Sequence, residues 1–93
     1  MRRIERTNAF HRDFKREKRA EHRRNIDALV ASIVALLAAD KPLSQKNRDH
    51  ALAGEWRDHR ECHLKPDLIM IYRKPDAKVL QLVRLGSHSE LFA

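Results

Sequence analysis

The pattern of apolar and polar positions predicts two N-terminal helices of different character. The first begins at a capping residue, Thr7 or Asn8, and runs to about His22. Phe10 and Phe14 are four residues apart, so they lie on one face of this helix and anchor it to a core. The remaining side chains are mostly charged, and we expect the rest of the helix to be a solvated surface.

The second predicted helix, over residues 25–40, is strongly amphipathic. At about 100° per residue, its large apolar side chains fall within an arc of about 160°. These side chains are Ile26, Leu29, Val30, Ile33, Val34, Leu36 and Leu37. Asn25 can cap the helix, and Pro42 enforces its end. This helix is expected to supply most of the core.

Strands are expected before and after the two helices along the chain. Residues 2–6 form a short strand before them, and residues 40–56 have no clean period and are expected to be an irregular loop. Three further strands are predicted at 60–65, 68–73 and 79–85. The links between these three are short and rich in turn residues, which makes neighbouring strands antiparallel.

The expected fold class is therefore α+β. A strand and two N-terminal helices precede an antiparallel strand meander, the helices pack on one face of the sheet, and a short turn or helix ends the chain. With 93 residues there is room for one core, so we expect a single domain over residues 1–93.

Composition excludes several classes of protein. The longest apolar stretch, residues 28–39, is shorter than the roughly 20 residues that a membrane-spanning helix needs. The basic N-terminus lacks the apolar region of a signal peptide. One cysteine, Cys62, cannot form an internal disulfide, and two glycines are too few for a phosphate-binding loop. We therefore expect a cytoplasmic protein that uses neither a membrane nor a nucleotide-binding motif.

Charge is concentrated at the N-terminus. The chain has a formal net charge of +7, and residues 1–24 hold ten Lys or Arg against four acids, a net +6. The remaining 69 residues carry a net +1. A basic block of this kind indicates a polyanion or an acidic protein as partner.

Histidine chemistry is the second notable feature, because six histidines are many for this length. His59 and His63 would chelate zinc on a helix, but on a strand four positions span about 13 Å, too far to share one ion. We therefore predict neither a metal site nor a cofactor. Alternation along residues 60–65 places Glu61 and His63 on one side and Cys62 on the other, which argues against a Cys/His nucleophile pair. Acid–base catalysis and plain surface histidines remain as the two interpretations.

The C-terminal half resembles a known family. The run RDHALAGEWRDHRECHLKPDLIMIYR, followed by VRLGSHSELF, is similar to the YafQ-type branch of the RelE/ParE toxin superfamily, whose members are bacterial toxins that cut messenger RNA on the ribosome. The resemblance is close over residues 48–93. Over the N-terminal half it rests on helix order and basic character alone.

The resemblance implies a RelE-like fold and ribonuclease chemistry without a metal. The ribose 2′-hydroxyl attacks the adjacent phosphate, a base takes its proton, an acid protonates the leaving 5′-oxygen, and cations stabilise the phosphorane. By resemblance, the catalytic positions are His50, His63, Asp67 and His88. We assign phosphate or RNA contacts to Arg60, Arg84, Phe92, Lys15, Arg16 and Arg19.

The individual roles are hypotheses. His50 and His63 are placed near the 2′-hydroxyl, Asp67 is the base or an orienting carboxylate, and His88 is the acid or a phosphate contact. Arg84 interrupts an apolar strand, so it must face outward or have a partner. Leu68 stands where relatives often have an aromatic residue. This difference affects which codon or nucleobase is preferred, rather than the proton chemistry.

Each of these residues also has a structural interpretation. Taken singly, His50 and His63 could be surface residues and Asp67 a turn residue, and Phe92 could close the core. The resemblance further implies a cognate antitoxin with an acidic segment that folds on binding, the ribosome and mRNA as partners, and contact with operator DNA only through the antitoxin complex. The alternatives are a ParE-like inhibitor of DNA gyrase and a non-catalytic RNA-binding module.

Overall fold

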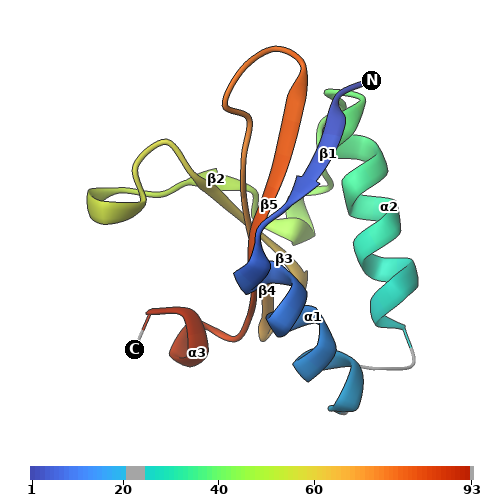
Figure 1. Cartoon of the computed structure of the whole chain (residues 1–93), viewed down its shortest axis with the longest axis vertical. Helices are drawn as coiled ribbons and strands as arrows, with labels where there is room; N and C mark the ends of the chain where they lie inside the picture. Colours follow the sequence, from blue (N-terminus) through green and yellow to red (C-terminus); the bar gives the residue numbers. More distant parts are fainter. Residues whose placement is uncertain (21–24, 93) are drawn as a thin grey trace.

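The computed structural model describes residues 1–20 and 25–92, and within them five strands form one sheet (Figure 1). In chain order the elements are β1 (Arg3–Arg6), α1 (Asn8–Arg19), α2 (Ile26–Ala38), the 3-10 turn η2 (Gln45–Asn47), β2 (His50–Ala51), the 3-10 turn η3 (Gly54–Trp56), β3 (Arg60–Lys65), β4 (Leu68–Arg73), β5 (Val79–Gly86) and α3 (His88–Phe92). The fold class is α+β, as predicted.

The sheet has the strand order β1-β5-β4-β3-β2. The predicted antiparallel meander of β3, β4 and β5 is confirmed, and β1 joins its outer edge by pairing in parallel with β5. The crossover that a parallel pair requires is supplied by α1 and α2. The strand β2 corrects the expectation of an irregular loop over residues 40–56, because His50 and Ala51 pair with Glu61 and Arg60 of β3.

The helix boundaries follow the predicted caps in part. Thr7 accepts a hydrogen bond from the Phe10 amide at 3.0 Å and donates one to the Val83 carbonyl at 2.7 Å, which ties the start of α1 to β5. α1 ends at Arg19 and Ala20 is extended, so the helix is shorter than the predicted run to about His22. Residues 21–24 lie outside the described residues. Asn25 is the N-cap residue of α2, as predicted, but its side chain makes no capping hydrogen bond.

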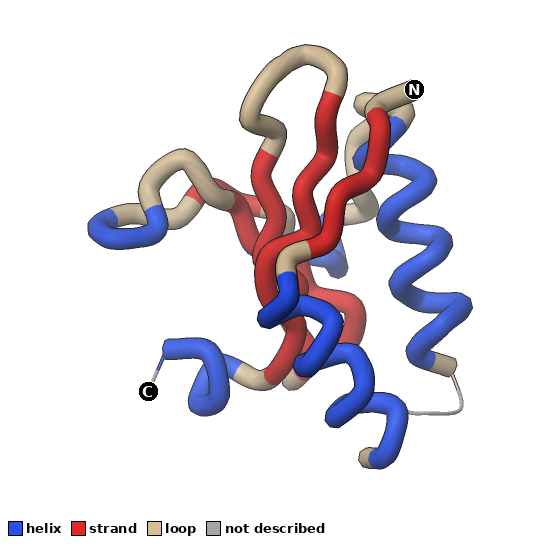
Figure 2. The backbone as a smooth tube through the Cα atoms, viewed as in Figure 1, coloured by secondary structure: helices blue, strands red, loops and turns tan. Residues whose placement is uncertain are grey.

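The two faces of the sheet are covered by different elements. Phe10 of α1 and the apolar side of α2 pack with Met70 and Leu82 on one face, which confirms that both N-terminal helices lie on the same side. The alternate β4 side chains Ile69 and Ile71 point to the other face, where Leu91 of α3 covers them. Figure 2 shows α3 on the side of the sheet away from α2.

None of the helices in the described ranges is long and apolar enough to cross a membrane.

Candidate active site

A buried glutamate stands at the centre of three histidines. Glu61 lies on β3 with only 4% of its side chain exposed. The Nε2 atom of His50 lies 3.7 Å from Glu61 Oε1, and the Nε2 atoms of His63 and His88 lie 3.4 Å and 3.3 Å from Oε2. We call these four residues the His–Glu cluster. They come from β2, β3 and α3, so the cluster forms only when the sheet and the last helix are in place.

The position of each residue on β2 and β3 follows from strand pairing. His50 lies directly opposite Glu61 in the antiparallel register of β2 and β3. His63 is two residues beyond Glu61 on the same strand, and therefore on the same face. Cys62 points the opposite way into the core, as predicted. Burial raises the pKa of its thiol to about 12, so the thiol is not a nucleophile near neutral pH.

His88 is placed by the cap of α3. The Ser87 amide donates to Glu90 Oε1 at 2.8 Å, and the Glu90 amide donates to Ser87 Oγ at 3.2 Å. This reciprocal arrangement is a capping box, which fixes where the helix begins. His88 is the first residue of the helix and reaches Glu61 from there. The hydrogen bond from Ser87 lowers the pKa of Glu90 and keeps it ionised in the cap.

Backbone carbonyls hold two of the imidazoles in a defined orientation. Nδ1 of His50 lies 2.7 Å from the Arg48 carbonyl oxygen, and Nδ1 of His63 lies 3.4 Å from that of Pro66. A carbonyl can only accept, so Nδ1 carries the proton in both rings. In the neutral form, Nε2 of each ring therefore keeps a lone pair and faces the carboxylate of Glu61.

Aromatic rings continue from the cluster along the surface. The ring centroids of His63 and His88 are 5.6 Å apart, as are those of His88 and Phe92. Phe92 in turn contacts Trp56 with a centroid separation of 6.1 Å. Phe92 is 39% exposed, so it does not simply close the core. The rings offer a surface on which unpaired bases can stack.

A hollow of about 300 Å³ lies beside His63 and is bordered by cations. Its lining residues are Lys46, Asn47, Arg48, His63, Leu64, Lys65 and Pro66. Asn47 is buried and donates a hydrogen bond from its side chain to the His63 carbonyl oxygen at 2.8 Å, which joins the loop before β2 to β3. The three basic residues were not among the predicted phosphate contacts.

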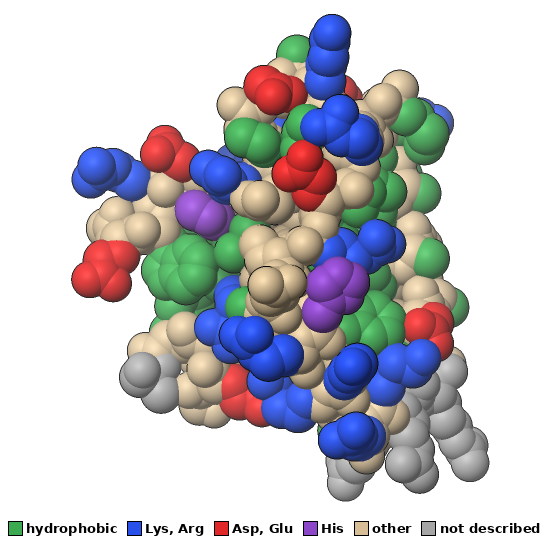
Figure 3. Space-filling model, viewed as in Figure 1, with side chains coloured by type: hydrophobic (Ala, Val, Ile, Leu, Met, Phe, Trp, Pro, Cys, Tyr) green, Lys and Arg blue, Asp and Glu red, His purple; other side chains and the backbone are tan. Residues whose placement is uncertain are grey.

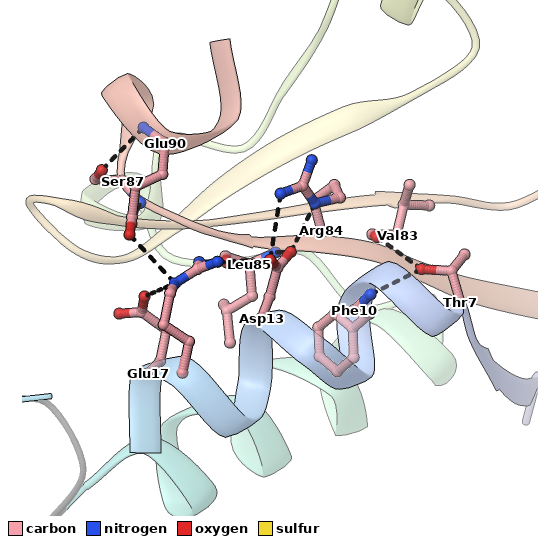
Figure 4. Close-up of polar contacts among 10 residues, drawn as sticks. Thr7, Phe10, Asp13, Glu17, Val83, Arg84, Leu85, Ser87 and Glu90 are labelled. Carbon is pink, nitrogen blue, oxygen red and sulfur yellow. Dashed lines mark hydrogen bonds and ion pairs between the residues drawn. The ribbon is translucent and has the colours of Figure 1, made fainter. Parts of the chain in front are cut away.

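A second buried carboxylate fixes α1 to β5 (Figure 4). Asp13 accepts hydrogen bonds from Arg84 Nε at 2.7 Å, the Leu85 amide at 2.9 Å and Arg16 Nη1 at 2.9 Å. Burial by itself would raise the pKa of Asp13, but these hydrogen bonds outweigh it and lower the pKa overall. Arg16 also forms an ion pair with Glu90, so this network links α1 to the helix that carries His88.

The predicted site residues thus divide into groups. His50, His63 and His88 come together around Glu61, and Phe92 lies beside His88. Asp67 is exposed in the turn between β3 and β4, and its side chain forms no hydrogen bond or ion pair with another described residue. The role predicted for Asp67, base or orienting carboxylate, stays a prediction, and the described contact that orients His63 is made by the carbonyl oxygen of Pro66.

The predicted cationic residues differ in how they are held. Arg84 has the partner that its position required, Asp13, and Arg16 shares that partner. Arg60 forms an ion pair with Asp49 at 3.2 Å. Lys15 and Arg19 are exposed on α1, where Figure 3 shows Lys and Arg side chains gathered over the helix.

Glu61 is the main residue that sequence reasoning missed. Alternation along β3 did place it on the same side as His63, and that was the available signal. Its central role depends on β2 and α3, which bring His50 and His88 to the same carboxylate from distant parts of the chain.

The sheet, with a histidine cluster at its edge, has the fold of the RelE-like toxins. Comparisons with known proteins identify the family within this class. The family model described as a bacterial toxin of type II toxin–antitoxin systems, YafQ, matches residues 2–93. The mRNA interferase toxin YafQ of Escherichia coli strain B/BL21-DE3 is 32% identical over 89 residues, which cover 96% of this chain and 94% of the relative.

Solved structures agree with the family match. The E. coli DinJ–YafQ complex contains a chain with a TM-score of 0.83 and 32% identity, covering 100% of both chains. A metal-bound toxin from Helicobacter pylori has a TM-score of 0.84 and 43% identity, covering 99% of this chain and 100% of that one. The chain therefore belongs to the YafQ family of type II toxin–antitoxin toxins.

Proposed function

We propose that this toxin is an endoribonuclease that cuts messenger RNA on the ribosome, in the cytoplasm. The observation that carries the proposal is the convergence of His50, His63 and His88 on the buried carboxylate of Glu61. Relatives that match most of the chain carry the name mRNA interferase toxin, which supports the same activity.

The geometry favours His50 as the base and His88 as the acid. Both side chains are more than half exposed, whereas His63 is 10% exposed. Because Nδ1 of His50 is held by a carbonyl, its Nε2 lone pair is free to take a proton from the ribose 2′-hydroxyl. His63 and Glu61 then act as positioning residues between the two exposed imidazoles.

The proposed reaction proceeds through in-line attack. The 2′-oxygen loses its proton to His50 and forms a bond to phosphorus, and the bond from phosphorus to the 5′-oxygen breaks. A protonated His88 delivers a proton to that oxygen. The products are a 2′,3′-cyclic phosphate and a 5′-hydroxyl. Lys46, Arg48 and Lys65 border the neighbouring hollow and supply positive charge for the RNA backbone.

A translation reaction with a defined message tests this proposal. Wild-type protein should shorten the message when ribosomes are translating it and leave naked message largely intact. An uncut message together with inhibited DNA supercoiling would instead favour a gyrase inhibitor. Binding of RNA with neither effect would favour the non-catalytic module.

Asp67 provides a separate prediction. Its carboxylate has no partner among the described residues, so Asp67→Asn should change the free energy of unfolding by less than about 0.5 kcal/mol. We expect the same variant to cut message more slowly, because the free carboxylate is available to the substrate. Urea unfolding and the cutting assay measure the two effects. Cutting at the wild-type rate would make Asp67 a turn residue only.

The basic face of α1 is proposed to hold ribosomal RNA. Arg12, Lys15 and Arg19 follow helical spacing and are all exposed. Arg16, on the same helix, forms an ion pair with Asp13. Replacing Arg12 and Lys15 with alanine should reduce the slope of log binding constant against log salt by about one for each lost phosphate contact. Ribosome binding at several salt concentrations measures the slope.

Lys41→Ala is the matched control for this experiment, because Lys41 is an exposed lysine that follows α2 rather than lying on α1. Its slope should equal that of the wild type. If the α1 double variant also keeps the wild-type slope, this helix does not contact RNA.

We also propose a cognate antitoxin as the protein partner. The E. coli DinJ–YafQ complex supports this, and the basic surface over α1 suits an acidic antitoxin segment that folds on binding. Contact with operator DNA is proposed only through that complex.

A further inference from the structure

The carboxylate of Asp49 joins the segment that carries His50 to two strands of the sheet. Asp49 Oδ1 accepts a hydrogen bond from the Tyr72 hydroxyl at 2.5 Å and one from Arg60 Nε at 3.2 Å. Arg60 and Tyr72 are paired residues of β3 and β4. A single carboxylate oxygen therefore holds the residue before β2 against both of these strands.

Tyr72 is a buried anchor that stays protonated. Its side chain is 1% exposed and belongs to the apolar cluster that includes α2. Burial and the hydrogen bond to Asp49 raise the pKa of the hydroxyl well above its ordinary value, so it keeps its proton and donates. A hydrogen bond to an ionised carboxylate is stronger than one between neutral groups. The contact from Tyr72 is therefore the firmer of the two that hold Asp49.

His50 itself lies on a short and exposed element. The strand β2 has two residues, and 54% of the His50 side chain is exposed. Successive side chains of a strand point to opposite faces, so Asp49 is directed to the face of Tyr72 while His50 faces Glu61. Asp49 thus holds His50 from the other side of the sheet and does not enter the His–Glu cluster.

The residue between Asp49 and the loop has a constrained backbone. Arg48 has φ 47° and ψ 44°, in the left-handed region that residues other than glycine rarely occupy. Such a conformation costs energy and persists where neighbouring contacts impose it. Here Asn47 binds the His63 carbonyl oxygen on one side, and Asp49 is held on the other. The Arg48 carbonyl oxygen then lies 2.7 Å from Nδ1 of His50.

We propose that Asp49, held by Tyr72, is the positioning residue for the general base His50. Its contacts keep the Arg48 carbonyl oxygen at Nδ1 of His50, and this keeps the Nε2 lone pair free for the ribose 2′-hydroxyl. Without them, Nε2 takes the ring proton and donates it to Glu61 Oε1, which lies 3.7 Å away, and the base is lost. The catalytic part of this role rests on the proposed ribonuclease function, whereas the link from Asp49 to the imidazole does not.

Two substitutions of Asp49 separate its hydrogen bonds from its charge. Asp49→Ala removes the acceptor and should slow single-turnover cutting by about 10- to 100-fold, the usual effect of a misplaced catalytic group. The ribosome concentration that gives half the maximal rate should not change, because Asp49 lies behind the site. Asp49→Asn removes the same charge but keeps an oxygen that accepts from Tyr72, so it should cut within about threefold of the wild type.

Tyr72→Phe tests the same contact from the other strand. It removes the donor, keeps the buried ring and leaves the carboxylate in place. Cutting should slow by about tenfold. Because this change is confined to one hydroxyl, it carries the test even if Asp49→Ala does not fold.

Nitrogen NMR of the histidine rings tests the link without any cutting. At about pH 8.5 the rings are neutral, and Nδ1 of His50 should carry the proton in the wild type. In Asp49→Ala and Tyr72→Phe, a form of His50 protonated at Nε2 should appear. His63, whose Nδ1 faces the Pro66 carbonyl oxygen, should be unchanged. A general loss of structure would change both rings.

Asp27→Ala is the matched control, because Asp27 is an exposed carboxylate on α2. It should equal the wild type in cutting and in the His50 spectrum. Equal slowing by Asp49→Ala and Asp49→Asn, or slow cutting with Nδ1 of His50 still protonated, would overturn the positioning role. If the ring proton moves in Asp49→Ala but the wild type never cuts message, the proposed ribonuclease function fails and the link from Asp49 to His50 stands.

Discussion

Replacing His88 with glutamine is expected to slow message cutting by about 10²- to 10⁴-fold, the usual contribution of a positioned acid or base. Glutamine keeps a polar side chain of similar reach but cannot deliver a proton near neutral pH. His88 is exposed at the first position of α3, and its Nε2 atom lies 3.3 Å from Glu61. The rate of message cutting in single-turnover translation reactions measures the effect.

The fold of this variant should be unchanged. His88 is outside the apolar clusters, and the cap of α3 is made by Ser87 and Glu90. We therefore expect unfolding by urea to match the wild type within about 0.5 kcal/mol. Lys41→Ala, an exposed position outside α1 and the His–Glu cluster, serves as the control and should cut at the wild-type rate. A His88→Gln variant that cuts as fast as this control would remove His88 from the reaction.

Replacing Asp13 with alanine is expected to lower the free energy of unfolding by about 3 kcal/mol, because it leaves buried partners of the carboxylate unpaired. The Leu85 amide loses its acceptor, and the partly buried Arg84 loses its counter-charge. Urea unfolding at neutral pH measures the loss. A loss below about 0.5 kcal/mol would contradict the structural role assigned to this network.

Asp27→Ala is the matched control for this substitution. Asp27 is 68% exposed on α2 and lies 3.4 Å from Lys18. Exposed pairs of this kind contribute little, so the control should change stability by less than about 0.5 kcal/mol.

The pH dependence of stability should follow from the same carboxylate. The pKa of Asp13 in the folded protein is below its ordinary value of 3.8, so the folded state binds its proton less readily than the unfolded state. Its contribution to stability is complete above the unfolded pKa and is lost as pH falls below 3.8 towards the folded pKa. The stability difference between wild type and Asp13→Ala should therefore shrink as the pH is lowered through this range.

Much of the fold could be predicted from local pattern. The turn at Pro66 and Asp67, the alternation along β3 and the amphipathic face of α2 are all visible in the sequence. The strand β2 was missed because a strand of two residues is too short to show an alternation of apolar and polar side chains. It is recognised only by its pairing with β3. The place of β1 beside β5 likewise depends on a parallel pairing that no local signal specifies.

The candidate site was predictable in its residue types but not in its connections. Arg84 interrupts an apolar strand, so the sequence showed that it needs a partner. That partner, Asp13, is 71 residues away along the chain, and the way α1 crosses β5 brings the two together. Glu61 was placed on the correct face, but its burial beneath three histidines requires the tertiary arrangement. Pairings of this kind depend on topology, which residue spacing does not encode.

The chemistry of the cut ends tests the central claim most directly. Message cut on the ribosome by the purified, metal-free protein can be examined for its new termini by enzymatic labelling and mass spectrometry. Attack by the ribose 2′-hydroxyl predicts a 2′,3′-cyclic phosphate, or the 3′-phosphate formed from it by hydrolysis, and a 5′-hydroxyl. Fragments with a 3′-hydroxyl and a 5′-phosphate, or a message that stays intact, would contradict the account.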